Sequence, residues 1–233
     1  DDRRMYRDIF IHVSNSKGAK DGEKALVELT GWKDPMKSPE GVVTRVLGRK
    51  GIHEVEMEAI ILERGFEDTF PKEVEEDAER IAKEKQADWK NEIARRKDFR
   101  DTLTFTIDPA DAKDFDDALS FKVLPDGKYE IGIHIADVSH YVEPGTILDR
   151  EAIKRGTSVY LVDRTIPMLP EILSNGLCSL NPDVERFTFS AVFIMDDNGT
   201  VFEKWFGKTV IHSDKRFSYE EAQAVLDDKK GLY

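Results

Sequence analysis

The sequence predicts an α+β fold in which a small antiparallel β-barrel is joined by a helix to a mixed domain of strands and shorter helices. Three features of the 233 residues support this prediction. Short, partly alternating β-branched runs fill the first 70 residues. The apolar spacing changes to a helical period over residues 71–98, and hairpin patterns alternate with short helical patterns from residue 102 onward. A chain of this length can form one large domain or two modest ones.

The predicted barrel consists of four strand-like runs. The first two are RDIFIHVS and KALVELTGW, which flank the turn-rich segment NSKGAKDGE. The other two are GVVTRVLG and HEVEMEAIILERGF, which flank RKGI. Four strands are one fewer than in a five-stranded OB-type barrel, so we expect a domain over residues 1–68 that is truncated at its front.

The segment 69–100 is predicted to be a connecting helix. Pro71 suits a first helical turn, and acidic residues follow it. Arg95, Arg96 and Lys97 favour the C-terminal end, where the helix dipole is negative. We expect the other charged residues of this helix to form a solvated face.

Residues 101–233 are predicted to combine hairpins with short helices. The strand TLTFTI comes first, and a hairpin follows over ALSFKV and YEIGIHIADV. A helix is predicted over ILDREAIKRG, with Gly156 as its C-cap. A second hairpin is predicted over RFTFSAVFIM and TVFEKWFGKTVIHS, and a final helix begins after Ser218.

The composition is that of a globular protein, with 39% apolar and 35% charged residues, and it excludes the disordered and membrane-spanning classes. The net charge of −12 argues at first against a nucleic-acid partner. Most of the excess lies in residues 101–233, however, which carry 24 acidic and 14 basic residues. A divalent cation bound among acidic side chains can make such a region locally positive. The single Cys178 excludes an internal disulfide and favours a reducing, cytoplasmic location.

The segment TIDPADAKDFDDALSF places five aspartates within ten positions, beside apolar residues that favour burial. Asp108 ends a predicted strand, and Asp114, Asp116 and Asp117 lead into the next one. Asp114 and Asp116 point to one side in extended backbone, while Phe115 can anchor the loop in the core. Carboxylates that converge in this way repel each other unless a cation binds them. The pattern predicts a site for Mg²⁺, which prefers oxygen ligands and activates water for phosphodiester cleavage.

Two other interpretations of the aspartates stay open at this point, namely solvated turns and a structural Ca²⁺ loop. An EF-hand requires Gly at its sixth position and Glu at its twelfth, and no register from Asp108 or Asp114 supplies them. Asp111 has no evident partner, and we expect a solvated loop residue. His134 alternates with isoleucines and is predicted to be a hydrogen-bonded strand residue, and Cys178 a small core residue.

The aspartate segment resembles the signature of the RNase II / RNase R (RNB) family of exoribonucleases, and the downstream residues that contain IGIHIADVSHYVEPG and NGLCSLNPDVERF are similar as well. The similarity is greater to the RNase R branch of the family. Residues 1–68 resemble the second cold-shock (OB) domain of that branch. The resemblance implies that residues 101–233 are the N-terminal part of a mixed α/β RNB catalytic domain. It also implies processive 3′→5′ hydrolysis of single-stranded RNA, with release of nucleoside 5′-monophosphates.

The resemblance further implies roles for individual residues. Asp108, Asp114 and Asp117 would hold Mg²⁺, for which Mn²⁺ could substitute. Asp116 would be the aspartate most needed for the chemical step. Tyr160 matches a tyrosine that stacks on RNA near the cleaved end, and aromatic stacking is a grip that tolerates any base.

Three cations of the predicted barrel are candidates for contacts with RNA phosphates: Arg45, Arg49 and Lys50. Exposed cations are more often only solvated, so both interpretations of these residues stay open. Single-stranded RNA is the expected partner, and no membrane contact is expected.

The resemblance covers only part of a family member. A full-length relative would continue through the second half of the RNB domain and an S1-type RNA-binding domain. We therefore expect this chain to be a fragment, whose uncovered apolar surface favours self-association and whose isolated activity is open. The alternative function is a non-catalytic RNA-binding module with a degenerate RNB domain.

Overall fold

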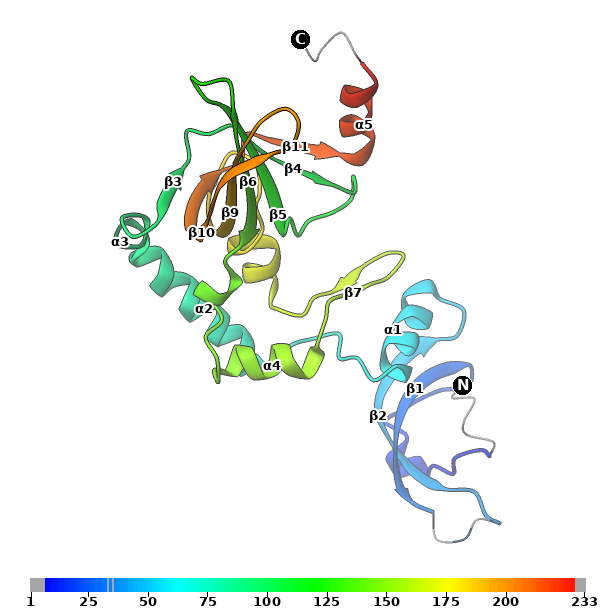
Figure 1. Cartoon of the computed structure of the whole chain (residues 1–233). Helices are drawn as coiled ribbons and strands as arrows, with labels where there is room; N and C mark the ends of the chain where they lie inside the picture. The colour runs from blue at the N-terminus through cyan, green and yellow to red at the C-terminus, as the bar shows by residue number, and fades with distance from the viewer. Residues whose placement is uncertain (1–6, 33, 35, 229–233) are drawn as a thin grey trace. The chain divides into compact units, whose positions relative to one another are not determined.

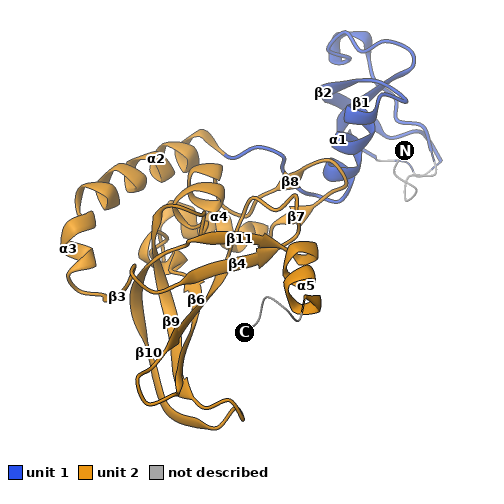
Figure 2. Ribbon diagram, turned by 90° about the horizontal axis from the view of Figure 1, so that it is seen from above, with its two compact units in different colours: residues 1–70 blue, residues 71–233 orange. Residues whose placement is uncertain are grey.

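The chain folds into two compact units, residues 1–70 and residues 71–233 (Figure 2). The first unit ends close to the expected end of the barrel domain at residue 68, and the predicted connecting helix belongs to the second unit. None of the helices in the described part of the chain is long and apolar enough to cross a membrane. The structure is a computed structural model that describes residues 7–32, 34 and 36–228.

The first unit contains an antiparallel pair of strands, β1 (Glu23–Gly31) and β2 (Glu40–Arg49). They confirm two of the four strands that the sequence predicts. The first predicted run is not a strand, because it forms only a bridge between Phe10 and Glu40, followed by a 3₁₀ turn at Val13–Asn15. The described residues of this unit thus form a two-stranded sheet rather than a closed barrel.

The fourth predicted strand is wrong, because residues His53–Glu63 form helix α1. This segment is rich in good helix formers, and glutamates in its first turn favour the positive end of the helix dipole. Val55 and Ile61 are buried, and Glu56 accepts a hydrogen bond of 2.6 Å from Lys24 on β1. Contacts with the strand pair thus favour a helix where apolar alternation suggested a strand.

The predicted connecting helix is shorter than expected and consists of two pieces. Helix α2 spans Lys72–Ala87, and α3 spans Trp89–Ile93 after a one-residue break. The indole ring of Trp89 stacks on Phe187, with ring centroids 4.0 Å apart, and this contact holds α3 against the sheet. The last part of the predicted helix, Lys97–Phe99, is strand β3.

A seven-stranded sheet with the order β11-β4-β5-β6-β9-β10-β3 forms the centre of the second unit (Figure 1). The pairs β11–β4 and β10–β3 are parallel, and the others are antiparallel. The pairs β5–β6 and β9–β10 confirm the two predicted hairpins. The remaining strands span Thr104–Asp108 (β4), Asp117–Val123 (β5), Tyr129–Ala136 (β6), Glu185–Met195 (β9), Val201–His212 (β10) and Lys215–Ser218 (β11).

The two faces of this sheet differ in character. One face is buried and partly polar, and the ring nitrogens of His134 lie 2.6 Å from the Ser190 hydroxyl and 2.8 Å from the Ser120 hydroxyl. These contacts confirm His134 as a hydrogen-bonded strand residue, and burial lowers its pKa to about 4. The expected self-association stays a prediction, and the opposite face would favour it. That face exposes the apolar side chains of Phe121, Ile133, Ile135, Phe189 and Phe206.

Shorter elements surround the sheet. Helix α4 (Ile147–Arg155) ends at Gly156, whose φ of 76° confirms the predicted C-cap. Helix α5 (Tyr219–Asp227) begins after Ser218, which confirms the predicted start through a reciprocal capping box with Glu221. The other elements are strands β7 (Val159–Tyr160) and β8 (Thr165–Ile166), the 3₁₀ turn Val138–His140 and the π-helix Ile172–Leu177.

Candidate active site

The aspartates lie on residues 108–117, called the aspartate loop below, which connect β4 to β5. Strands β4 and β5 pair at only two positions, and the pairing stops where Phe105 lies opposite Leu119. Asp108 is the last residue of β4, and Asp117 is the first residue of β5. The two strands are therefore not paired with each other where the loop begins and ends, although Asp108 lies opposite Ser218 on β11 and Asp117 opposite Ile135 on β6. The carboxylates lie at this opening between β4 and β5.

The middle of the aspartate loop is fixed to the core by Phe115. Its side chain is 4% exposed, and its backbone N–H donates a hydrogen bond of 3.0 Å to Oγ of Ser179. Its carbonyl accepts a bond of 2.8 Å from the N–H of Leu180. The carbonyl of Asp116 accepts a bond of 2.9 Å from the N–H of Ala136 on β6. These contacts confirm that Phe115 anchors the loop, and they hold the neighbouring aspartates at the sheet opening.

The four aspartates act on one another electrostatically. Asp116 is open to solvent on one side and surrounded by protein on the other. This burial raises its pKa, and the charges of Asp114, Asp117 and Asp108 raise it further. Burial also raises the pKa of Asp108, and the charges of Asp117 and Asp114 raise it further. The Thr106 hydroxyl and the Arg216 guanidinium oppose this rise only in part. The repulsion expected from the sequence is therefore present in the folded chain.

The donor atoms of the aspartate loop fit a divalent cation. They are carboxylate oxygens, which Mg²⁺ prefers, and Oδ2 of Asp108 is buried with no hydrogen-bond partner. Within the described residues, no three His, Cys, Asp or Glu side chains are gathered closely enough to form a complete metal site. A cation would have to draw the carboxylates closer together. Metal binding by Asp108, Asp114 and Asp117 thus stays a prediction.

The structure brings Tyr160 to the aspartates. Its hydroxyl donates a hydrogen bond to Oδ2 of Asp114, although the two residues are 46 positions apart in the sequence. This bond, together with burial and the charges of Asp114 and Asp116, raises the pKa of Tyr160 to about 12. The tyrosine is nevertheless 63% exposed, so its ring is accessible for stacking. RNA stacking by Tyr160 stays a prediction.

The three predicted phosphate-binding cations lie in the first unit. The guanidinium of Arg45 is 2.8 Å from Glu58 and 3.6 Å from Asp68, and these carboxylates would compete with a phosphate. Arg49 and Lys50 are exposed at the end of β2. RNA contacts by these residues stay predictions, and Arg45 is the weakest candidate of the three.

Two residues that the sequence analysis did not single out also hold the aspartate loop. Oγ of Ser179 donates a hydrogen bond of 3.1 Å to the carbonyl of Lys113, in addition to its bond with the Phe115 amide. Arg216 on β11 contacts the start of the loop, at the carbonyls of Pro109 and Ala110. Ser179 follows Cys178, which is buried as expected, in a motif similar to the RNB family. No local pattern marked Arg216, because its contacts lie more than 100 residues away.

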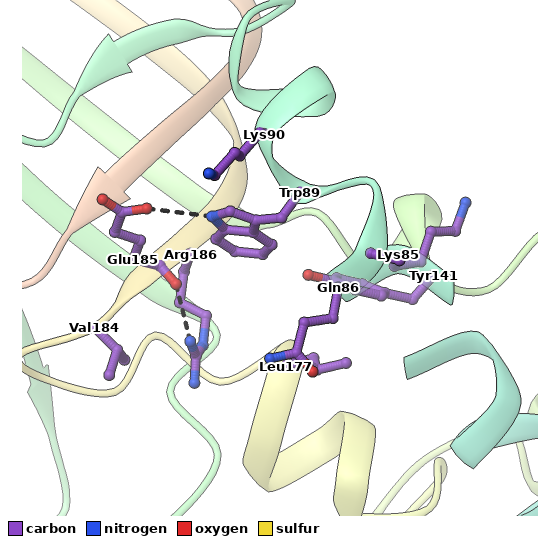
Figure 3. Close-up of a pocket in the computed structure, with 10 residues that line it drawn as sticks. Lys85, Gln86, Trp89, Lys90, Tyr141, Leu177, Val184, Glu185 and Arg186 are labelled. Carbon is purple, nitrogen blue, oxygen red and sulfur yellow. Dashed lines mark hydrogen bonds between the residues drawn. The ribbon is translucent and has the colours of Figure 1, made fainter. Parts of the chain in front are cut away.

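A separate pocket of about 750 Å³ lies beside helices α2 and α3 and the start of β9 (Figure 3). Nε1 of Trp89 donates a hydrogen bond of 3.2 Å to the Glu185 carboxylate, and Arg186 donates one of 2.9 Å to the Glu185 carbonyl, as Figure 3 shows. None of the four aspartates lines this pocket. The candidate active site is therefore the opening between β4 and β5, and it is distinct from this pocket.

Comparison with known proteins identifies both parts of the chain. Residues 96–232 match the RNB domain, and residues 1–71 match a cold shock domain. The RNB match alone covers more than half of the chain. The chain belongs to the RNB family. The predicted α+β combination of a cold-shock domain with part of an RNB domain is thereby confirmed.

Curated relatives of this RNB chain are considerably longer. Ribonuclease R of Thermotoga maritima is 42% identical over 234 residues, which cover 100% of this chain and 32% of that protein. The exosome complex exonuclease dis3 of Schizosaccharomyces pombe is 46% identical over 217 residues, which cover 90% of this chain and 22% of that protein. The chain thus spans between a fifth and a third of the length of these two relatives.

Solved structures share the RNB architecture. RNase R of Mycoplasma genitalium, in complex with double-stranded RNA, superposes with a TM-score of 0.82 at 29% identity, over 96% of this chain and 39% of that one. Yeast Ssd1, described as a pseudonuclease, superposes with a TM-score of 0.70 at 20% identity, over 97% of this chain and 29% of that one. The second likeness concerns the fold alone. Since the fold occurs in a pseudonuclease, catalysis has to be argued from the site.

Proposed function

We propose that this chain carries the metal-binding part of an exoribonuclease active site, which hydrolyses single-stranded RNA processively from 3′ to 5′ and releases nucleoside 5′-monophosphates. The observation that carries the proposal is the gathering of four mutually repelling aspartates at one opening of the sheet. Membership of the RNB family and the similarity to proteins named ribonuclease R support the choice of RNA as substrate.

In this proposal, Asp108, Asp114 and Asp117 hold Mg²⁺, for which Mn²⁺ can substitute. The ion, when bound, polarises a phosphoryl oxygen and lowers the pKa of water. The buried Oδ2 of Asp108, which has no hydrogen-bond partner, is an oxygen ligand that folding leaves available. Burial raises the pKa of Asp108, and repulsion by Asp117 and Asp114 adds to this effect. A cation relieves the repulsion, which favours its binding.

Asp116 is assigned to the chemical step. Its backbone carbonyl is fixed by the 2.9 Å bond from Ala136, while its side chain is open to solvent. The raised pKa of this carboxylate makes it a better proton acceptor than an ordinary aspartate. Its carboxylate oxygens can therefore hold the proton that the attacking water loses.

Tyr160 is assigned to positioning the RNA end. Its exposed ring offers a stacking surface to any base, as a nuclease without sequence preference requires. The hydrogen bond from its hydroxyl to Asp114 places that ring beside the carboxylates. A base stacked on Tyr160 therefore has its phosphate close to the aspartate loop. Arg49 and Lys50 of the cold-shock domain are candidates for additional phosphate contacts.

The experiment is a digestion of uniformly labelled single-stranded RNA, whose released nucleotides carry the label, by this chain in the presence of Mg²⁺, compared with Asp116→Asn. The expected result is stepwise release of nucleoside 5′-monophosphates, reduced at least about 100-fold in Asp116→Asn, with RNA affinity changed by less than about twofold. Asp111→Asn is the matched control, because Asp111 lies on the same loop and is exposed. Release that persists in Asp116→Asn would contradict the assignment of the chemistry.

The second candidate function is RNA binding without catalysis. Its specific support is that the described residues contain no complete three-ligand metal site. It predicts RNA binding with no nucleotide release in any variant, and no Mn²⁺ binding in calorimetry. The exoribonuclease proposal predicts Mn²⁺ binding that disappears in the double variant Asp114→Asn/Asp117→Asn.

A further inference from the structure

The guanidinium of Arg216 contacts the aspartate loop at two places. Its Nη2 atom donates hydrogen bonds of 2.9 Å to the carbonyl of Pro109 and 2.6 Å to the carbonyl of Ala110, directly after Asp108. The guanidinium carbon also lies 4.9 Å from the ring centroid of Phe115, the residue between Asp114 and Asp116 in the sequence. A planar guanidinium is suited to both tasks, because it offers several donors in one plane and a flat face for an aromatic ring.

The sheet places Arg216 at this position. Strand β11 runs parallel to β4, with Arg216 opposite Thr106 and Ser218 opposite Asp108. Nε of Arg216 is buried and has no hydrogen-bond partner, which costs free energy that the contacts with the loop offset. The positive charge of Arg216 also opposes, in part, the burial that raises the pKa of Asp108.

We propose that Arg216 is a positioning residue that fixes the conformation of the aspartate loop and thereby the arrangement of its carboxylates. Ser179 holds the loop on the core side, through Lys113 and Phe115, and Arg216 holds it on the β11 side. With both contacts in place, the start of the loop is held in a fixed position relative to its middle. The consequence for metal binding rests on the proposed function, whereas the consequence for loop conformation does not.

The test compares Arg216→Gln and Arg216→Lys with the unchanged chain by two measurements. Hydrogen exchange of the peptide that covers residues 109–117 reports on the loop, and calorimetric titration with Mn²⁺ reports on the carboxylates. The matched control is Arg150→Gln, because Arg150 donates a comparable bond of 2.6 Å to the Gly145 carbonyl and contacts no part of the aspartate loop. Thermal unfolding of each variant checks that the fold is retained.

The expected result for Arg216→Gln is exchange in the loop peptide about tenfold faster and Mn²⁺ affinity about tenfold weaker, with other peptides unchanged. Arg216→Lys should bind Mn²⁺ less than about threefold more tightly than Arg216→Gln, because lysine keeps the charge but lacks the planar guanidinium, with its several donors and flat face. Arg150→Gln should change neither measurement.

Three outcomes would count against this role of Arg216. Unchanged exchange in Arg216→Gln would show that Arg216 does not hold the loop. Full recovery by Arg216→Lys would show that charge, and not positioning, is what matters. Faster exchange with unchanged Mn²⁺ affinity would overturn the link to the carboxylates. If the unchanged chain binds no Mn²⁺, the proposed metal site fails, and the exchange result alone decides whether Arg216 fixes the loop.

Discussion

The hydroxyl of Tyr160 donates a hydrogen bond to Oδ2 of Asp114. The bond joins the residue assigned to RNA stacking with a carboxylate assigned to the metal, although they come from different strands and loops. A hydrogen bond to a ligating carboxylate usually fixes its orientation and raises its affinity for the cation. Under the proposed function, contact with the RNA end and binding of the cation would therefore be coupled through one side chain.

Replacing Tyr160 separates these two roles. We expect Tyr160→Phe to weaken Mn²⁺ binding by about tenfold, because Asp114 loses its orienting donor, while RNA affinity stays unchanged because the ring is kept. Tyr160→Ala should weaken both, with RNA binding reduced by about 1 kcal/mol or more for the lost stacking contact. Calorimetry with Mn²⁺ and fluorescence titration with RNA measure the two effects. Stronger Mn²⁺ binding in Tyr160→Phe would mean that the hydroxyl competes with the cation.

Asp116→Asn is expected to stabilise the metal-free chain slightly. The folded-state pKa of Asp116 is raised, so its ionisation costs stability. The free energy that the neutral Asp116 carboxyl contributes to folding is complete below the pKa of Asp116 in the unfolded chain. It is lost as the pH rises through the raised pKa of Asp116 in the folded chain. At pH 7 the amide should raise the unfolding temperature by about 1 to 2 °C, a small effect because the side chain is partly exposed.

Calorimetry of Asp116→Asn in the presence of a chelator tests that prediction. The gain should disappear as the pH falls through the raised pKa of Asp116, where the carboxyl becomes neutral like the amide. Asp111→Asn, on the same loop, should show no gain. If Asp116→Asn unfolds at a lower temperature than the unchanged chain at pH 7, the ionised carboxylate of Asp116 does not destabilise the fold.

Much of the second unit could be predicted because its signals are local. The β5–β6 hairpin follows from alternating runs around a turn at Asp126 and Gly127, and α5 follows from Ser218 three residues before Glu221. The anchoring of Phe115 could be predicted as well, because a single large apolar residue among carboxylates has only the core as a favourable environment.

The remaining features depend on contacts between distant segments. The pairing of β11 with β4 joins Arg216 to Thr106, and nothing in either strand marks the other as its partner. Helix α1 replaced a predicted strand because Val55 and Ile61 pack on the strand pair, and apolar runs of this length fit either element. The bond between Tyr160 and Asp114 likewise could not be predicted, since only the folded chain brings these residues together.

His134 should make the second unit sensitive to acid. Burial lowers its pKa from 6.5 to about 4, so the unfolded chain binds a proton more readily than the folded chain between these values. The contribution of neutral His134 to the free energy of unfolding is complete above pH 6.5. It should fall by up to about 3 kcal/mol as the pH decreases toward 4. Urea unfolding at several pH values measures this loss. His134→Gln should remove most of it, whereas His212→Gln, at a partly exposed position, should not; an unchanged pH dependence in His134→Gln would assign it elsewhere.

Arg96 and Asp137 form an ion pair of 2.7 Å whose two side chains are 0% and 1% exposed. Burial would raise the pKa of Asp137, but hydrogen bonds from Arg96 and Ser139 and the nearby positive charges outweigh it and lower the pKa. Asp137→Asn leaves a buried guanidinium without this partner, so we expect the free energy of unfolding to fall by about 3 kcal/mol. Asp126→Asn, which breaks a solvent-exposed pair with Lys128, should leave the free energy of unfolding nearly unchanged. Urea unfolding compares the two variants, and equal losses would show that burial does not strengthen the Arg96–Asp137 pair.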